Sequence, residues 1–263
     1  MDFSRNYLVH YYEADSSRRL SLPALLQYFE DIALLHSSAR GYNLEYYEEH
    51  HCGWMLLKWD IAIHRLPVFG ETVCVGTHVH ALKRFLADRE FVLLDAEEKT
   101  LVSVRSNWLF VDTDRRRPLR VPEQHYKSYL VSPESETEFI TIPEVPAVVL
   151  PENTDESSES TGLSIFHRNI RSANSDIDTN KHVNNVRYIC WALDSLPSGY
   201  IAARTPVGMR VHYKKEIGPE TDAEVLSLCA EPDANGVELS RHTVRNGTEE
   251  YCSLEIDWQK MHG

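Results

Sequence analysis

The chain has 263 residues, of which 42% are hydrophobic and 25% are charged, enough to bury one or two substantial cores. Its formal net charge of −13 argues against nucleic acid as a partner, because phosphates are bound by basic surfaces. The chain has no apolar run long enough to span a bilayer, no signal peptide's hydrophobic region and no metal-site spacing among its five cysteines, so we expect a cytoplasmic protein without membrane span, metal or cofactor.

The first half predicts a short strand, a long helix and then four strands. The helix covers Leu22–Ala39, where apolar residues recur at helical spacing. Apolar and polar residues often alternate in the strands, as they do in half-buried sheets. These strands cover residues 55–65, 72–82, 85–94 and 101–111.

A connector follows at residues 131–164. It contains four prolines and ends in an acidic, serine-rich run, which is the composition of a linker. We expect a plain tether, long enough to reach around a domain.

The second half repeats the order of elements. A helix begins near Asn184, a residue type that favours the N-cap. The strands cover residues 209–216, 223–230, 237–244 and 251–258. Asn235-Gly236 and Asn246-Gly247 predict type I′ hairpin turns between them. A helix followed by an antiparallel meander, made twice, predicts an α+β fold with two helix-wrapped sheets.

The most informative segment is 178–185, which places a carboxylate, an amide and an imidazole at every second residue before this helix. The first N–H groups of a helix lack intrahelical partners and lie at the positive end of its dipole, where an oxyanion is stabilised. We therefore expect Asp178, Asn180 and His182 to form a catalytic loop. The N–H groups of Val183 and Asn184 are the expected oxyanion donors.

A degenerate copy of this segment lies in the first half. With Asp15 aligned to the aspartate of the segment, Ser17 and Arg19 stand where the asparagine and the histidine are. The aspartate and the following helix are kept, but the amide and the imidazole are lost.

A second match between the halves lies downstream. Pairing Gly70 with Gly218 sets Val68 opposite Glu216. On this alignment the second half carries all four candidate catalytic residues, and the first half should contain no active site.

These residues resemble those of the acyl-acyl carrier protein (acyl-ACP) thioesterases, the plant plastid enzymes and their bacterial relatives. The similarity runs from about Tyr7 to Trp258 and is strongest at residues 178–188, followed by Glu216 34 residues after His182. It implies a double hotdog fold, in which each unit is a long helix wrapped by a curved antiparallel sheet. The expected units are 1–130 with the acyl pocket and 165–263 with the active site, joined by the linker 131–164.

The resemblance also implies an activity and a partner. The enzyme would hydrolyse the thioester of fatty acyl-ACP, releasing free fatty acid and ending fatty acid synthesis. Two units on one chain predict a monomeric pseudo-dimer or a homodimer.

Glu216 and Asp178 are the candidate bases. We favour Glu216 as the group that polarises the attacking water, with Asp178 shaping the loop and Asn180 and His182 as donors or orienting groups. Plant members commonly have a cysteine directly after the glutamate. Ile217 stands there in this chain, which excludes a thiolate nucleophile at that position.

Acyl carrier protein is strongly acidic, so binding it requires a local basic patch on this negatively charged chain. The first candidate lies near the predicted loop, and a solvated charged edge is the alternative interpretation. It consists of Arg168, Arg171, Lys181, Arg187, Lys214 and Lys215. The arginine run 115–117, with Arg120, is a second candidate.

Degeneration of the first half suggests that its interior is freed to hold the acyl chain, and the resemblance implies the same. Several apolar side chains there would line the pocket or belong to an ordinary core. They are Trp54, Met55, Leu57, Trp59 and Phe85.

Three other functions stay open at this point. An acyl-coenzyme A thioesterase would share the fold and the chemistry. A non-catalytic acyl-carrier binding module would not need Asp178, Asn180, His182 and Glu216. A hotdog dehydratase is disfavoured, because its site typically relies on a different spacing of acid and histidine.

Overall fold

The computed structural model describes residues 1–131, 138–149 and 163–261. The chain forms two compact units, Met1–Pro143 and Glu144–Gly263. Among the described residues, no helix combines the length and the apolar character needed to cross a membrane.

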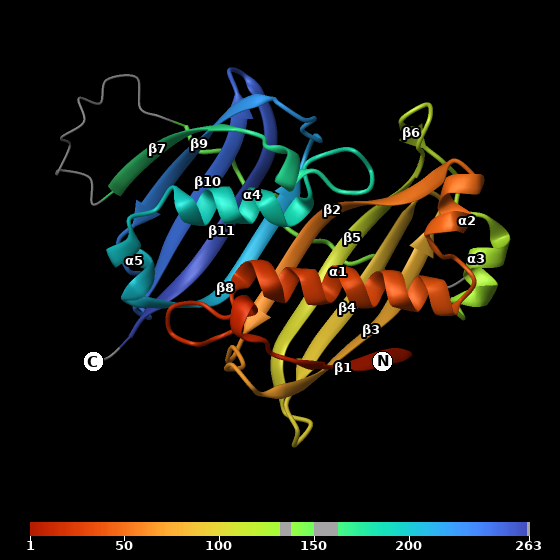
Figure 1. Ribbon diagram of the computed structural model, residues 1–263, viewed down its shortest axis with the longest axis horizontal. Helices are drawn as coiled ribbons and strands as arrows, with labels where there is room; N and C mark the ends of the chain where they lie inside the picture. Colours follow the sequence, from red (N-terminus) through yellow and green to blue (C-terminus); the bar gives the residue numbers. More distant parts are fainter. Residues whose placement is uncertain (132–137, 150–162, 262–263) are drawn as a thin grey trace. The chain divides into compact units, whose positions relative to one another are not determined.

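The first unit is an antiparallel sheet with a long helix on one face (Figure 1). Its strands pair in the order β1, β3, β4, β5, β2, and a short β6 pairs with β5. Its strands are β1 Phe3–Leu8, β2 Cys52–Ile63, β3 Thr72–Lys83, β4 Leu86–Leu94, β5 Thr100–Asp112 and β6 Arg117–Pro118. Its helices are α1 Leu22–Ala39, α2 Leu44–Glu49 and α3 Glu123–Ser128, with a 3₁₀ turn at Tyr11–Glu13.

The second unit repeats this plan with a shorter central helix (Figure 1). Its strands pair in the order β8, β11, β10, β9, β7, all antiparallel. Its strands are β7 Leu163–Arg171, β8 Arg204–Tyr213, β9 Asp222–Ala230, β10 Val237–Asn246 and β11 Glu249–Lys260. Its helices are α4 Asn185–Asp194 and α5 Ser198–Ala202, with a 3₁₀ turn at Asn174–Asp176.

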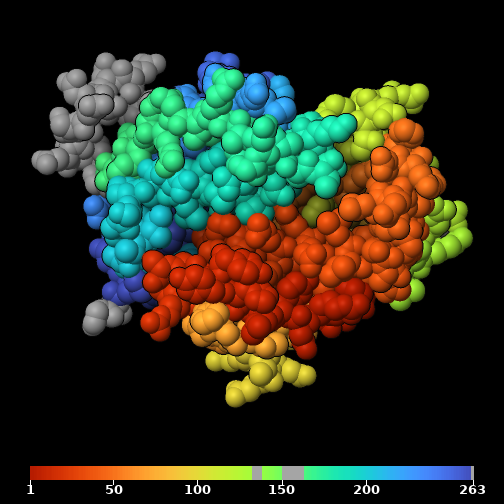
Figure 2. Space-filling view, viewed as in Figure 1, coloured from red at the N-terminus to blue at the C-terminus, as the bar shows by residue number. Residues whose placement is uncertain are grey.

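Helix α1 has the bounds that the sequence predicts. Ser21 caps it by accepting a hydrogen bond from the Ala24 amide at 3.3 Å, and a proline lies in its first turn. Its inner face packs on the sheet, where Phe29 lies 5.4 Å from the ring of Phe91. Its outer face carries exposed side chains such as Leu34, and this part of the chain covers the visible face of the unit, red to orange in Figure 2.

The predicted type I′ turns are wrong. Such a turn needs positive φ at both central residues, and here only Gly236 (φ 77°) and Gly247 (φ 58°) have it. In the first turn, the Asp233 carboxylate instead accepts hydrogen bonds from the backbone amides of Asn235 and Val237 at 2.8 and 2.9 Å. This side chain provides the turn geometry, so the asparagine need not be left-handed.

Residues 138–149 of the predicted connector pack against the units. In the first unit, the amide of Ile140 donates to the carboxylate of buried Asp88, and Ile142 is buried. In the second unit, Val148 is buried and its amide donates to Thr243 Oγ1 at 2.8 Å. The expectation of a plain tether is therefore wrong for this stretch. The acidic run that the sequence places at 153–162 lies outside the described residues.

Candidate active site

Asp178 builds the loop that carries the predicted catalytic residues. Its Oδ1 accepts hydrogen bonds from the backbone amides of Asn180 at 2.8 Å and His182 at 3.5 Å. Its own amide donates to the carbonyl of His182 at 2.8 Å, and Lys181 adopts the left-handed conformation (φ 65°) needed to close the turn. Its Oδ2 lies 3.4 Å from Asn180 Nδ2. The carboxylate is thus engaged in holding the loop.

The first unit contains the same loop without the side chains that are predicted to be catalytic. Asp15 Oδ1 accepts from the amides of Ser17 at 2.8 Å and Arg19 at 3.0 Å, and the Asp15 amide donates to the Arg19 carbonyl at 2.7 Å. Arg18 takes the left-handed position, with φ 62°. The backbone confirms the predicted alignment of the two segments.

His182 and Glu216 meet beside this loop. His182 Nε2 lies 3.8 Å from Glu216 Oε2, and their side chains are 27% and 32% exposed. A reacting group can therefore reach them from solvent. The arrangement pairs an imidazole with a carboxylate of the kind that takes part in general acid and base chemistry.

The backbone of Ile217 fixes the neighbouring Glu216. The carbonyl of Ile217 accepts a hydrogen bond from the Val183 amide at 2.8 Å, and its amide donates to Tyr188 Oη at 3.1 Å. Both backbone polar groups of buried Ile217 are thus held by the Asp178 loop and by helix α4. These bonds set the position of Glu216 relative to His182.

The structure corrects the downstream match between the halves. The amide of Val9 donates to the carbonyl of Glu71 at 2.9 Å, and the amide of Ser172 donates to that of Thr221 at 3.0 Å. Val9 and Ser172 are separated by the same interval as the two loop aspartates, so these bonds are equivalent. Glu71 therefore corresponds to Thr221.

This register places Gly70 opposite Glu220, and both residues have positive φ, 84° and 52°. The glycine match expected from the sequence is two positions off, because a glutamate occupies the left-handed position in the second unit. Leu66, which is 3% exposed, and not Val68, stands where Glu216 is. The first unit still lacks the carboxylate.

The predicted oxyanion donors are wrong. Asn184 caps α4 as expected, accepting from the Val186 amide at 2.8 Å. However, the amide of Val183 already donates to Ile217, and that of Asn184 donates to the carbonyl of Asp176 at 2.8 Å. At this helix start, the amide without an acceptor among the described residues is that of Asn185.

The sequence matches one family along most of its length. Residues 1–129 match the acyl-ACP thioesterase N-terminal domain, and residues 161–260 match the acyl-ACP thioesterase C-terminal domain. The chain belongs to the acyl-ACP thioesterase family.

Curated relatives are distant. The chain is 24% identical over 244 residues to a chloroplastic palmitoyl-acyl carrier protein thioesterase of Cuphea hookeriana, covering 89% of this chain and 56% of that protein. It is 24% identical over 260 residues to the chloroplastic oleoyl-acyl carrier protein thioesterase 2 of Arabidopsis thaliana, covering 94% and 67%. The chain thus spans little more than half the length of the Cuphea relative.

Solved structures confirm the predicted double hotdog fold. A Lactobacillus plantarum protein described as an oleoyl thioesterase superposes with a TM-score of 0.84 at 24% identity, over 99% of this chain and 97% of that one. The 12:0-ACP thioesterase of Umbellularia californica superposes with a TM-score of 0.79 at 18% identity, over 98% and 94%.

Most of the predicted basic patch is neutralised by neighbouring acids. Five of the six side chains lie beside carboxylates of the second unit. The pairs are Arg168 with Asp194, Arg171 with Asp222, Arg187 with Asp176, Lys214 with Glu250 and Lys215 with Glu249. Lys181 is exposed and pairs with no carboxylate in the part of the chain that the structure describes. It is therefore the member best able to attract an acidic partner.

The predicted pocket residues differ in burial. Trp59 is fully buried, and its ring packs against those of Phe29, Phe91 and Trp108 at 5.3–6.3 Å. These contacts make it part of the core. Half-buried positions are held by Trp54, Met55, Leu57 and Phe85. Their role in lining an acyl pocket stays a prediction.

The position of Tyr188 in the sequence does not predict its contact with Ile217. Its equivalent in the first unit is Leu25, and the equivalent of Ile217 is Pro67, which has no amide hydrogen to satisfy. The Tyr188 hydroxyl and the Ile217 amide that donates to it therefore occur together in the second unit. Both are missing from the first unit. A comparison of the two helices at this position could have revealed the pair.

Proposed function

We propose that this protein hydrolyses the thioester of fatty acyl-ACP and releases free fatty acid. The observation that carries the proposal is the approach of His182 Nε2 to within 3.8 Å of Glu216 Oε2, beside the loop that Asp178 closes. The unit with this pair belongs to a chain of the acyl-ACP thioesterase family.

Glu216 is the proposed general base. A water oxygen attacks the thioester carbonyl carbon while one water proton passes to the Glu216 carboxylate. The tetrahedral oxyanion accepts hydrogen bonds from the Asn185 amide and from the side chain of His182 or Asn180. Collapse of this intermediate breaks the C–S bond, and the leaving sulfur takes the proton from Glu216, giving a carboxylic acid and a thiol.

Two alternatives for the chemistry fit the structure less well. Asp178 is a poorer base than Glu216 because its oxygens already accept hydrogen bonds from the loop. Cys190 is half-buried in α4, and burial raises the pKa of its thiol, which disfavours the thiolate. Direct attack by water is therefore the mechanism that we propose.

The proposed partner is acyl carrier protein bearing a fatty acyl chain. Exposed Lys181 lies in the loop between Asn180 and His182, where it would meet an acidic carrier beside the reacting thioester. The cytoplasmic location and the monomeric or homodimeric state expected from the sequence stay predictions.

Glu216→Gln tests the function with little change of shape. We expect the variant to fold and to lose about 10²-fold or more in turnover of acyl-ACP, the scale for removal of a positioned base. Glu220→Gln is the matched control, because this exposed carboxylate lies in the following turn and should leave turnover unchanged. A wild-type rate in Glu216→Gln would remove the proposed role.

Two measurements separate the alternatives. Turnover of one acyl group carried on ACP and on coenzyme A distinguishes the two thioesterases, and faster turnover of the coenzyme A ester would favour that function. A chain that binds acyl-ACP without hydrolysing it would be a carrier-binding module.

A further inference from the structure

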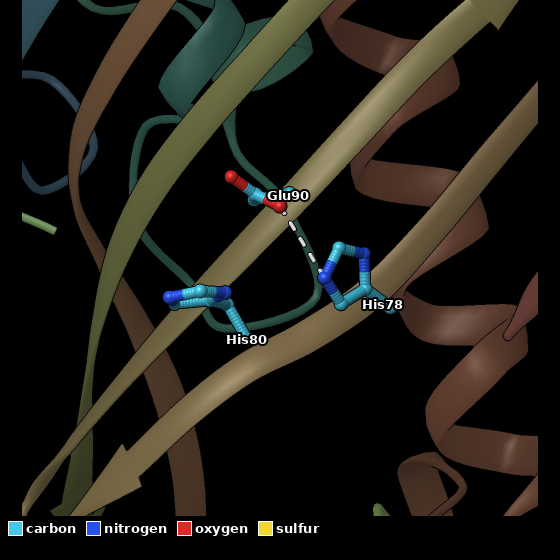
Figure 3. A group of neighbouring side chains, drawn as sticks. All are labelled: His78, His80 and Glu90. Atoms are coloured by element: carbon cyan, nitrogen blue, oxygen red, sulfur yellow. Dashed lines mark ion pairs between the residues drawn. The ribbon is translucent and has the colours of Figure 1, made fainter. Parts of the chain in front are cut away.

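Three potential metal ligands gather on the sheet of the first unit. They are His78 and His80 on β3 and Glu90 on β4, and one ligand atom from each lies within 4.8 Å of the others (Figure 3). His78 Nε2 lies 3.3 Å from Glu90 Oε2. We propose that these three side chains bind a divalent transition-metal ion of the zinc class.

The sheet places the three side chains together. His78 and Glu90 are direct partners in the antiparallel ladder between β3 and β4. The register of that ladder shifts between Val79 and Ala81, so His80 is the extra residue of a β-bulge. Residues two apart in a strand share a face, and the rings of His78 and His80 lie 6.2 Å apart, nearly perpendicular. His80 therefore lies on the same face of the sheet as the His78–Glu90 pair.

A simple ion pair does not account for the third ligand. The second unit has a comparable cross-strand pair, His167 Nε2 to Glu224 Oε2 at 2.7 Å. Among the described residues, only the group at His78 brings three possible ligands so close together. His80 is therefore the feature that distinguishes this cluster from an ordinary pair.

Two nitrogens and one carboxylate oxygen form a donor set typical of zinc. With Zn–N and Zn–O bonds of about 2.0–2.2 Å, tetrahedral ligands lie about 3.3–3.6 Å apart. The His78–Glu90 separation of 3.3 Å already fits, and the side chains of these two residues are 26% and 28% exposed. Half-exposed side chains have room for the small rotations that would bring His80 to the same spacing. A water molecule would complete the coordination.

The surroundings orient the two paired ligands. Glu90 Oε1 lies 3.9 Å from Arg105 Nε, which leaves Oε2 directed at His78. His78 Nδ1 lies 3.2 Å from the sulfur of Met1, so its Nε2 is the nitrogen directed at the carboxylate. Outer contacts of this kind fix the orientation of metal-binding histidines.

The donor set also predicts selectivity. Magnesium and calcium prefer oxygen ligands, whereas imidazole suits zinc, copper and nickel. The spacing of the cysteines led us to expect no metal site, but this cluster contains no cysteine. It lies entirely in the first unit and uses none of the residues proposed for hydrolysis.

Calorimetric titration of the full chain with Zn²⁺ tests the proposal. We expect saturable binding of one ion, no binding of Mg²⁺, and a rise in melting temperature with zinc that chelator reverses. His80→Ala should weaken zinc binding by about 10-fold or more, since changes outside the ligand shell already cost 10–100-fold. His167→Ala is the matched control and should bind like wild type.

Both possible failures of the experiment are informative. Wild-type affinity in a folded His80→Ala, or equal losses in His80→Ala and His167→Ala, would overturn the site. If His80→Ala does not fold in the presence of chelator, Glu90→Gln replaces it, because this change keeps the shape of the side chain and removes its charge. Wild-type affinity in Glu90→Gln would then overturn the proposal.

Discussion

Tyr188→Phe should show whether the hydroxyl on α4 positions Glu216, the proposed catalytic base. The change keeps a ring that is 2% exposed and removes the oxygen that accepts the Ile217 amide at 3.1 Å. Ile217 is 1% exposed, so water cannot readily replace this acceptor. A buried amide without a partner costs about 1–3 kcal/mol of stability. Burial raises the pKa of Tyr188, so the hydroxyl is neutral at working pH and its removal changes no charge.

The amide that loses its partner directly follows Glu216. The Ile217 carbonyl would still accept the hydrogen bond from the Val183 amide, but the segment after β8 would lose its second anchor on the Ile217 amide. Misplacement of a reacting group by about 1 Å can cost about 10²-fold in rate. We therefore expect kcat for acyl-ACP to fall by about 10–10²-fold with little change in KM, because no substrate contact is removed.

A tyrosine of the first unit provides the matched control. Tyr28 is 4% exposed, lies on α1 and donates its hydroxyl hydrogen to Glu13 at 2.6 Å. Tyr28→Phe should lower the melting temperature by a similar amount without slowing single-turnover release of fatty acid. If Tyr188→Phe lost stability but kept the wild-type rate, its hydrogen bond would serve the fold and not the base.

Four further substitutions test other parts of the structure. Arg19→Ala should leave turnover nearly unchanged, whereas His182→Ala should slow hydrolysis by about 10²–10³-fold, the scale for one oxyanion donor. If a folded Arg19→Ala were inactive, a second active site would be required. Lys181→Glu should raise KM for acyl-ACP more than KM for a short thioester. Added salt should have the same effect, because it screens exposed charges beyond about 8–10 Å. Equal changes in the two KM values would remove Lys181 from the docking face. Burial lowers the pKa of His125 from 6.5 to about 4. The buried neutral ring therefore contributes fully to folding stability above pH 6.5, and this contribution is lost as the pH falls toward 4. His125→Phe should flatten the fall in melting temperature across that range, and an unchanged slope would contradict the assignment.

Local signals in the sequence predicted the long helix well. The cap at Ser21, the proline in the first turn and the apolar spacing all act within α1, and its predicted bounds are those observed. Strand ends were predicted less well, as for β2, which covers Cys52–Ile63 and not 55–65. Where a strand ends depends on its partners, which lie far away in sequence. The short helices α2, α3 and α5 were missed for the same reason, since helices of this length depend on tertiary packing.

The chemical composition of the site was visible in the sequence, but its hydrogen bonds were not. Asp178, Asn180 and His182 are close in sequence, so their spacing alone predicts a shared loop. The occupation of the Val183 amide depends on Ile217, which belongs to a different part of the chain. Hydrogen-bond donors and acceptors that meet only through tertiary contacts cannot be paired from sequence spacing. The prediction of Val183 and Asn184 as oxyanion donors was wrong for this reason.

The degenerate unit acts as an internal control for the roles of these residues. Its loop closes around Asp15 through the same backbone bonds, with Arg19 and Leu66 where the other unit has His182 and Glu216. The loop therefore forms without the imidazole and without the second carboxylate, and in both units it closes on an aspartate. Placing a carboxylate and an imidazole in a partly covered site costs solvation that a leucine there avoids. We infer that the second unit retains His182 and Glu216 for chemistry, and that the aspartate common to both loops is retained for folding.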